Sequence, residues 1–234
     1  MTTEVWPTAE ELAAIIAERI TEKIAAVQRE GRTPTIVLTG GTIAIDAYEQ
    51  IQDGDVDWTN VEFYWGDERF VPAGDADRND QQAKDAFLDR LGVPAERIHA
   101  MPAQGAGLEM AEAADQYAAS LPAEPFDLVL LGVGPDGHIA SLFPGHPQLH
   151  ETKRLAVEVF DSPKPPPERI SLTYPALRNA QSVWLIVAGE GKAEAVARAH
   201  AHGTIEDTPA SGVQGLTETV WLLDVAASSL IVTA

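Results

Sequence analysis

A carboxylate, an imidazole and a hydroxyl lie close together in the segment 132–147. Asp136, His138 and Ser141 follow the uninterrupted apolar run Leu128–Leu131, and glycines and a proline break the chain between that run and the histidine. Imidazole is the side chain best suited to acid–base chemistry near neutral pH, and a nearby carboxylate can orient it. A lone histidine in a glycine-rich loop is more often a surface residue. Its place directly after a buried strand favours a catalytic role instead.

A second group of residues has the composition of an anion cradle. The apolar run 35–39 precedes Gly40, Gly41 and Thr42, and a helix is predicted over 43–52. Glycines let the backbone approach an anion, the first N–H groups of the helix point at it, and the hydroxyl of Thr42 adds a donor. Strand-to-helix turns with glycine are also common without a ligand, so this pattern alone leaves phosphate binding open. The Gly-Lys-Ser/Thr ending of a P-loop is missing, which argues against a nucleoside triphosphate.

Charged residues also follow the predicted strand 61–65, where Asp67 and Arg69 stand in the stretch Gly66–Pro72. The planar guanidinium of an arginine suits the clamping of an anionic substrate group. The alternative is a surface ion pair between Arg69 and a neighbouring acidic residue.

Three further cations are candidate phosphate donors. Lys164 and Arg169 lie in the proline-rich stretch 161–169, which we expect to be a stiff extended loop, and solvated charges are an equally good interpretation of them. Lys192 stands near the start of a predicted helix, where the macrodipole disfavours a cation. Such a local conflict indicates a functional position.

Several cofactor and metal classes lack their signatures. The chain has no cysteine and no His-Glu-x-x-His motif, and His138, His146 and His150 lie on chain that glycine and proline interrupt. Neither a Gly-x-Ser-x-Gly elbow nor a Gly-x-Gly-x-x-Gly turn after the first predicted strand is present. The remaining set of groups suits acid–base chemistry on a sugar phosphate without a metal or a cofactor.

The composition excludes two classes of partner. A formal net charge of −20 repels nucleic acid and anionic membranes, and no apolar run approaches the roughly 18 residues of a membrane helix. An anionic substrate is also repelled at long range, so a phosphate site must rest on local donors. The absence of cysteine and of an apolar N-terminal segment leads us to expect a cytoplasmic protein.

These candidate residues need a parallel sheet that brings several strand ends to one edge. Strands and helices alternate in the pattern on both sides of the proline-rich stretch, so we predict one α/β domain over residues 1–234. The predicted strands are 35–39, 61–65, 94–101, 128–131, 153–160, 183–188 and 220–224, and the predicted helices are 8–30, 43–52, 79–91, 108–120, 174–177 and 189–200.

Read in chain order, several motifs are similar to those of one known family. They are Thr39–Thr42, Gly66–Pro72, Leu131–Gly145, the proline-rich Ser162–Pro166 with Arg169–Ser171, and the helix start Gly191–Lys192. Together they resemble the 6-phosphogluconolactonase family over most of the chain. The segment Leu131–Gly145 is the most specific of them.

This resemblance implies hydrolysis of 6-phospho-D-glucono-1,5-lactone to 6-phospho-D-gluconate, the second step of the oxidative pentose phosphate pathway. It also implies a sugar-phosphate isomerase/deaminase-like fold, which is a single-domain, Rossmann-like, three-layer α/β fold with a mostly parallel central sheet. We expect a monomer or weak homodimer that binds a small substrate and needs no cofactor.

By the same resemblance His138 is the catalytic residue. Neutral His138 takes a proton from the water that attacks the lactone carbonyl. Arg69 or loop N–H groups stabilise the oxyanion, and either Asp136 or Asp67 orients the imidazole. The residues expected around the substrate and its phosphate are Gly40, Gly41, Thr42, Arg69, Lys164, Arg169 and Lys192.

Two other functions compete with this one. Glucosamine-6-phosphate deaminase/isomerase resembles the family in fold, but its pattern after the histidine runs into Asn-Glu-Pro with an additional catalytic carboxylate. Here that place holds Ser141–Pro144, which favours the lactonase. A non-catalytic sugar-phosphate sensor is the second alternative. We see no DNA-binding helix-turn-helix before this domain, and the acidic charge is wrong for DNA.

Overall fold

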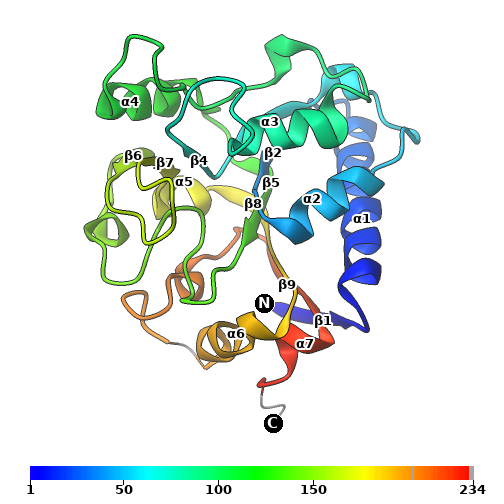
Figure 1. Ribbon diagram of the computed structural model, residues 1–234. Helices are drawn as coiled ribbons and strands as arrows, with labels where there is room; N and C mark the ends of the chain where they lie inside the picture. The colour runs from blue at the N-terminus through cyan, green and yellow to red at the C-terminus, as the bar shows by residue number, and fades with distance from the viewer. Residues whose placement is uncertain (202, 232–234) are drawn as a thin grey trace.

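The computed structural model describes residues 1–201 and 203–231, and its centre is a six-stranded sheet in which every strand pair is parallel (Figure 1). The strand order is β1-β9-β8-β5-β2-β3. This confirms the α/β class with a mostly parallel central sheet. The predicted domain over 1–234 includes residues 202 and 232–234, which lie outside the described residues. The strands are β1 (Thr2–Trp6), β2 (Thr35–Leu38), β3 (Glu62–Trp65), β5 (Phe126–Gly132), β8 (Ala180–Val187) and β9 (Glu218–Asp224).

Alternate strand residues pack into two hydrophobic cores, one on each face of the sheet. Leu128 and Leu130 of β5 pack in a core with α1 (Ala9–Arg29) and α2 (Thr42–Gln50). Their neighbours Val129 and Leu131 pack in the other core with α4 (Met110–Ser120) and α5 (Tyr174–Leu177). Figure 1 shows these two pairs of helices on opposite sides of the strands. Since β5 is buried on both faces, its sequence is a continuous apolar run rather than an alternating one.

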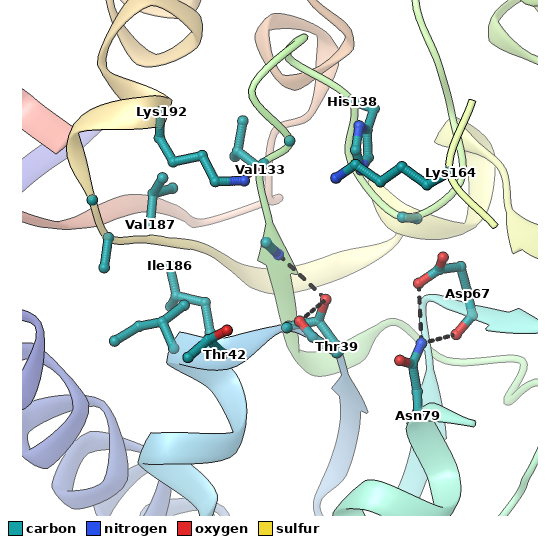
Figure 2. A pocket seen from close by; sticks show the side chains of 18 of the residues that line it. Thr39, Thr42, Asp67, Asn79, Val133, His138, Lys164, Ile186, Val187 and Lys192 are labelled. Atoms are coloured by element: carbon teal, nitrogen blue, oxygen red, sulfur yellow. Dashed lines mark hydrogen bonds between the residues drawn. The ribbon is translucent and has the colours of Figure 1, made fainter. Parts of the chain in front are cut away.

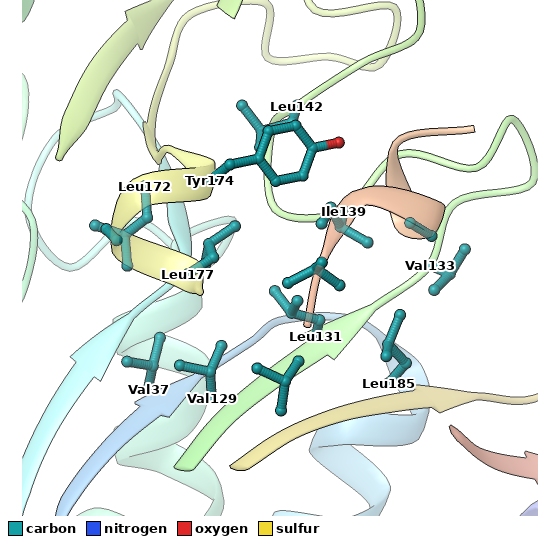
Figure 3. Packing of buried hydrophobic residues seen from close by; sticks show 14 of the residues in the cluster. Val37, Val129, Leu131, Val133, Ile139, Leu142, Leu172, Tyr174, Leu177 and Leu185 are labelled. Carbon is teal, nitrogen blue, oxygen red and sulfur yellow. The ribbon is translucent and has the colours of Figure 1, made fainter. Parts of the chain in front are cut away.

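The second core also anchors the loop that follows β5. Ile139 and Leu142, on either side of a sharp turn, are fully buried and pack with Leu131, Tyr174 and Leu177 (Figure 3). The loop that carries His138 is therefore held at its base by apolar contacts and is not a free surface connection.

A small antiparallel sheet stands beside the main one and was not predicted. It has the order β4-β7-β6 and consists of β4 (Asp67–Arg69), β7 (Arg169–Leu172) and β6 (Ala156–Val159). Its register pairs Arg69 with Arg169 and Asp67 with Ser171. Strand β4 is three residues long and entirely charged, so it carries no apolar alternation that would indicate a strand.

Most predicted helices are confirmed, and the first one shows why. Helix α1 begins where Thr8 accepts a hydrogen bond from the backbone N of Glu11 at 3.1 Å, and it ends before Gly31, whose φ is 76°. Its buried stripe contains Leu12, Ile16, Ile20, Ile24 and Val27, which recur with the period of a helix. The remaining helices are α3 (Asn79–Ala83), α6 (Ala193–His200) and α7 (Val225–Ser228).

Two predicted elements need correction, and one strand was not predicted. The predicted strand 94–101 is wrong, because this stretch holds a 3-10 helix over Ala95–Arg97 and only Ile98 forms a bridge to the sheet. The predicted helix 79–91 is α3 followed by a π-helical turn over Lys84–Leu88. Strand β1 was missed because it is an edge strand whose mostly exposed residues show no apolar pattern.

In the described part of the chain, no helix combines the length and the apolar character that crossing a membrane requires.

Two buried tyrosines close the carboxyl ends of β2 and β3. The hydroxyl of Tyr48 accepts a hydrogen bond from the N–H of Thr39 at 3.1 Å and donates to the carbonyl of the same residue at 3.0 Å. In the same way, the hydroxyl of Tyr117 accepts a hydrogen bond from the N–H of Trp65 at 2.8 Å and donates to the carbonyl of Trp65 at 2.9 Å. Each hydroxyl satisfies a pair of backbone groups where the chain leaves the sheet.

Replacing Tyr48 with phenylalanine is expected to lower the free energy of unfolding by about 1–3 kcal/mol, because both backbone groups of Thr39 lose their partner in a buried place. Urea unfolding measures this change. Tyr64 is the matched control, since it is buried and its hydroxyl makes no hydrogen bond to another described residue. Tyr64→Phe should change stability by about 0.5 kcal/mol or less. Equal losses in the two variants would contradict the assignment.

Candidate active site

A cavity of about 510 Å³ lies beyond the carboxyl ends of β2, β5 and β8 (Figure 2). This is the edge at which open α/β sheets bind their ligands. Nearly all predicted site residues line it, although they come from segments far apart in the sequence. Those residues are Gly40, Gly41, Thr42, Asp67, Arg69, His138, Lys164, Arg169 and Lys192.

The imidazole of His138 is held by Asp136, which stands behind the ring rather than in the wall of the cavity. The Nδ1 atom of His138 lies 2.5 Å from Oδ1 of Asp136, and the backbone N–H of His138 donates to the same oxygen at 3.2 Å. Burial raises the pKa of Asp136, but the hydrogen bond and the charge of His138 outweigh it and lower the pKa to about 2. An ionised carboxylate only accepts, so Nδ1 carries a proton, and in the neutral form of the ring Nε2 keeps its lone pair for a ligand.

Close packing fixes the ring and the carboxylate in this arrangement. A Cβ atom on Gly134 would lie 2.0 Å from Nδ1 of His138 and 2.5 Å from the oxygen of Asp136, so only glycine fits there. The loop closes on itself through a hydrogen bond of 2.9 Å from the N–H of Gly134 to the carbonyl of His138. Phe143 packs against the imidazole, with ring centroids 4.6 Å apart. The side chain of His138 is 13% exposed and lines the cavity.

Asp67, the other carboxylate predicted as a possible partner of the imidazole, has different partners in the structure. Asp67 accepts a hydrogen bond from the hydroxyl of Ser141 at 2.6 Å and from the amide of Asn79. Its nearest cation is Arg169, at 3.8 Å. Of the two alternatives, the structure therefore favours Asp136 as the group that orients the ring. Ser141 is fully buried and outside the cavity lining, so its hydroxyl supports Asp67 and does not meet a ligand.

Lys164 and Lys192 bring two ammonium groups to the same cavity. Both side chains line the cavity, and Figure 2 shows Lys192 reaching toward Val133, to whose carbonyl it donates at 2.7 Å. Burial and the charge of Lys164 lower the pKa of Lys192, and the charge of Asp136 opposes them. Two cations that repel each other in a cleft favour an anion between them.

The two arginines that β4 and β7 pair have different tasks. The guanidinium of Arg169 is buried and donates to the carbonyls of Lys164, Pro165 and Pro166 at 3.1, 3.4 and 3.2 Å. It thus holds the loop that carries Lys164. Arg69 donates through Nη1 to the carbonyl of Asp77 at 2.8 Å and to the amide oxygen of Asn79. Its Nε is buried without a partner among the described residues, whereas Nη2, which makes no hydrogen bond to another described residue, is the donor that Arg69 keeps for a ligand in the cavity.

The Gly40–Thr42 cradle has the backbone that an anion site requires. Gly41 is the residue before helix α2 and has a φ of 99°, which favours glycine. Thr42 is exposed at the first turn of α2, where the helix N–H groups have no partner within the helix. Gly40, Gly41 and Thr42 thus line the wall of the cavity, and the binding of an anion by them stays a prediction.

Sequence reasoning missed other parts of the wall. The sequence places Asn79 at the start of the predicted helix 79–91, and no pattern in the neighbouring residues indicates that it belongs to a site. An apolar patch on the wall comes from Ile43, Ile186 and Val187. Within residues 1–201 and 203–231, no three histidine or acidic side chains gather in a way that could hold a metal ion.

The chain is similar to known proteins over most of its length. Residues 7–221 match the family model described as glucosamine-6-phosphate isomerases/6-phosphogluconolactonase. The chain is 46% identical to a 6-phosphogluconolactonase of Streptomyces coelicolor, with 93% of this chain and 90% of the relative covered. It is 42% identical to a 6-phosphogluconolactonase of Mycobacterium tuberculosis, with 94% of each covered.

Solved structures agree with these matches. The 6-phosphogluconolactonase of Trypanosoma brucei superposes with a TM-score of 0.84 at 27% identity, covering 99% of this chain and 98% of that one. A monomeric glucosamine-6-phosphate deaminase gives a TM-score of 0.81 at 22% identity, with 98% and 100% covered. The second likeness shows a shared fold and nothing further.

Proposed function

This chain belongs to the glucosamine-6-phosphate isomerase/6-phosphogluconolactonase family, and we propose that it hydrolyses 6-phospho-D-glucono-1,5-lactone to 6-phospho-D-gluconate in the pentose phosphate pathway. The observation that carries the proposal is the imidazole of His138, held by Asp136 at 2.5 Å beside a cavity that two lysines line. The relatives named 6-phosphogluconolactonase match over nearly their whole length, which supports the same choice.

Hydrolysis begins with proton transfer from water to the imidazole. Nε2 of His138 accepts the proton while the water oxygen attacks the lactone carbonyl, and Asp136 stabilises the imidazolium that forms. The new carbon–oxygen bond turns the carbonyl oxygen into an oxyanion. The free donor of Arg69 and the N–H groups of the Gly40–Thr42 cradle are the candidates that stabilise it.

The intermediate then collapses and the ring opens. The bond between the former carbonyl carbon and the ring oxygen breaks, and the imidazolium of His138 donates its proton to that oxygen. The product carries a carboxyl group and a new hydroxyl. Lys164 and Lys192 hold the phosphate away from the reacting carbon, so the lactone is kept in register throughout.

Glucosamine-6-phosphate deamination is the nearest alternative. The segment Ser141–Pro144 stands where the deaminase pattern has an additional carboxylate, and it contains no acidic residue. Instead Ser141 is bonded to Asp67, and Phe143 packs on the imidazole. These contacts favour the lactonase.

One experiment separates the candidate functions. Freshly generated 6-phosphogluconolactone is supplied in an assay coupled to phosphogluconate oxidation, with spontaneous hydrolysis subtracted, and glucosamine 6-phosphate is tested in parallel for ammonia release. Faster lactone hydrolysis without ammonia release supports the proposal. Ammonia release would instead indicate the deaminase, and binding without turnover would indicate a sensor.

We predict that EDTA leaves the lactonase activity intact, because a positioned general base suffices for an ester that already hydrolyses in water. The assay is run before and after dialysis against EDTA. A loss of activity that added zinc restores would overturn the prediction of a metal-independent enzyme.

We further propose a cytoplasmic enzyme without a cofactor that works as one domain over residues 1–234. The cavity supports the last point, because its walls come from the main sheet and from β4 and β7 of the small one. A monomer or weak homodimer, with neither nucleic acid nor membrane as a partner, stays our prediction.

A further inference from the structure

Asn79 contacts three parts of the active site at once. Its amide oxygen accepts a hydrogen bond from Nη1 of Arg69, and its amide nitrogen donates to the carbonyl of Asp67 at 2.8 Å and to the carboxylate of Asp67 at 3.4 Å. A Cβ atom on Gly40 would lie 2.0 Å from the same amide oxygen, so the side chain also packs against the Gly40–Thr42 cradle. Asn79 is 3% exposed and lines the cavity.

The backbone of Asn79 is itself fixed by a buried carboxylate. Oε1 of Glu68 accepts hydrogen bonds from the backbone N–H groups of both Arg69 and Asn79 at 2.8 Å. Its other oxygen accepts from the N–H of Asp80 at 2.9 Å, and Glu68 is 1% exposed. Strand β4 and the first turn of α3 are thereby joined through one side chain. The amide of Asn79 is consequently presented to Arg69 from a rigid base.

Arg69 depends on this amide for its orientation. Apart from Asn79, the only acceptor bonded to its guanidinium in the described residues is the carbonyl of Asp77. Asp77 lies in the exposed loop before α3. An arginine side chain has many rotamers, so a single contact to such a loop does not fix the plane of the guanidinium.

We propose that Asn79 is a positioning residue, which sets the guanidinium plane of Arg69 so that its free donors meet the lactone. An amide suits this place because it accepts from the cation and donates to Asp67, whereas a carboxylate would repel Asp67. The inference rests on the proposed lactonase function for its kinetic part. Asn79 acts through Arg69 and does not touch the reacting atoms.

A double-mutant cycle tests the proposal. Asn79→Ala is expected to lower kcat/KM for 6-phosphogluconolactone about tenfold when Arg69 is present, and by less than about twofold in the Arg69→Ala background. Equal losses in both backgrounds would overturn the proposal, because Asn79 would then act independently of Arg69. Asn79→Leu, which keeps the number and branching of the side-chain heavy atoms, replaces the alanine variant if the latter fails to fold.

The control is Gln81→Ala in the same helix. Among the described residues, the side chain of Gln81 donates only to Asp85, at the exposed surface and at 2.8 Å, so kcat/KM should not change. A tenfold loss in this variant too would show that any polar deletion in α3 disturbs the site, and the positioning role would fall.

A second measurement does not depend on activity. The Nε–H signal of Arg69 in a proton–nitrogen correlation spectrum is assigned by its disappearance in Arg69→Ala. Its hydrogen exchange is expected to become about tenfold faster in Asn79→Ala, since the guanidinium is then free to move. Unchanged exchange would overturn the inference. An inactive wild-type protein with the expected exchange effect would instead overturn only the proposed function.

Discussion

Replacing His138 with alanine is expected to lower kcat for 6-phosphogluconolactone by about 10²–10⁴-fold, the usual contribution of a general base. No other imidazole lines the cavity among the described residues, so no side chain of the same kind can take over the proton transfer. The lysines and the cradle remain in place. Binding of 6-phosphogluconate should therefore persist, and titration calorimetry measures it beside the steady-state rates.

Two further variants give this prediction its controls. His146→Ala removes an imidazole that lies outside the cavity lining, and it should leave kcat unchanged. Asp136→Asn keeps the shape of the partner, but its amide can donate to Nδ1 and favour the tautomer whose Nε2 carries the proton. We expect a loss in kcat for Asp136→Asn as well, because that tautomer cannot accept a proton from water at Nε2. Turnover near the wild-type rate in His138→Ala would end the assignment of a general base.

Lys192→Ala is expected to raise KM for 6-phosphogluconolactone by roughly 10–100-fold, because a charge-assisted hydrogen bond to the phosphate contributes about 1.5–3 kcal/mol. The half-buried ammonium already lies beside Lys164 and is poorly solvated, so an anion gains more from it than from a surface lysine. The unphosphorylated glucono-1,5-lactone lacks the group that Lys192 binds. Its KM should change little.

The comparison of KM for the two lactones decides whether Lys192 binds the phosphate. Lys164→Ala, assayed in the same way, shows whether Lys164 shares the phosphate, whereas Arg169→Ala also releases the loop that carries Lys164. Lys153→Ala is the matched control for the change in net charge, because Lys153 is exposed and lies outside the cavity lining. Equal rises in KM for both lactones in Lys192→Ala would rule out a phosphate role.

Residues that directly follow a buried strand could be predicted from the sequence. Thr42 and His138 stand next to long apolar runs, and the ends of parallel strands meet at one edge, so their proximity follows from local patterns. Lys192 was found by its conflict with the helix dipole. The structure places all three at the same cavity.

Contacts between distant short segments could not be predicted. The pairing of β4 with β7 joins residues about a hundred positions apart, and neither strand is long enough to show a period. The role of Asn79 could not be predicted for the same reason, since it depends on contacts with Arg69 and Gly40, which are distant in the sequence. The error at 94–101 has another cause, because its apolar residues Ile98 and Met101 lie three positions apart, a spacing that suits a turn as well as a strand.

The shape of the proline-rich loop owes as much to Arg169 as to its prolines. The buried guanidinium of Arg169 donates to three consecutive carbonyls of the loop, so the backbone conformation does not depend on the side chain at position 164. The residue that holds the loop and the residue that contacts the ligand are thus different ones. A designer who wants the cavity to accept a sulfonate or a carboxylate in place of the phosphate would vary position 164 and leave Arg169 untouched.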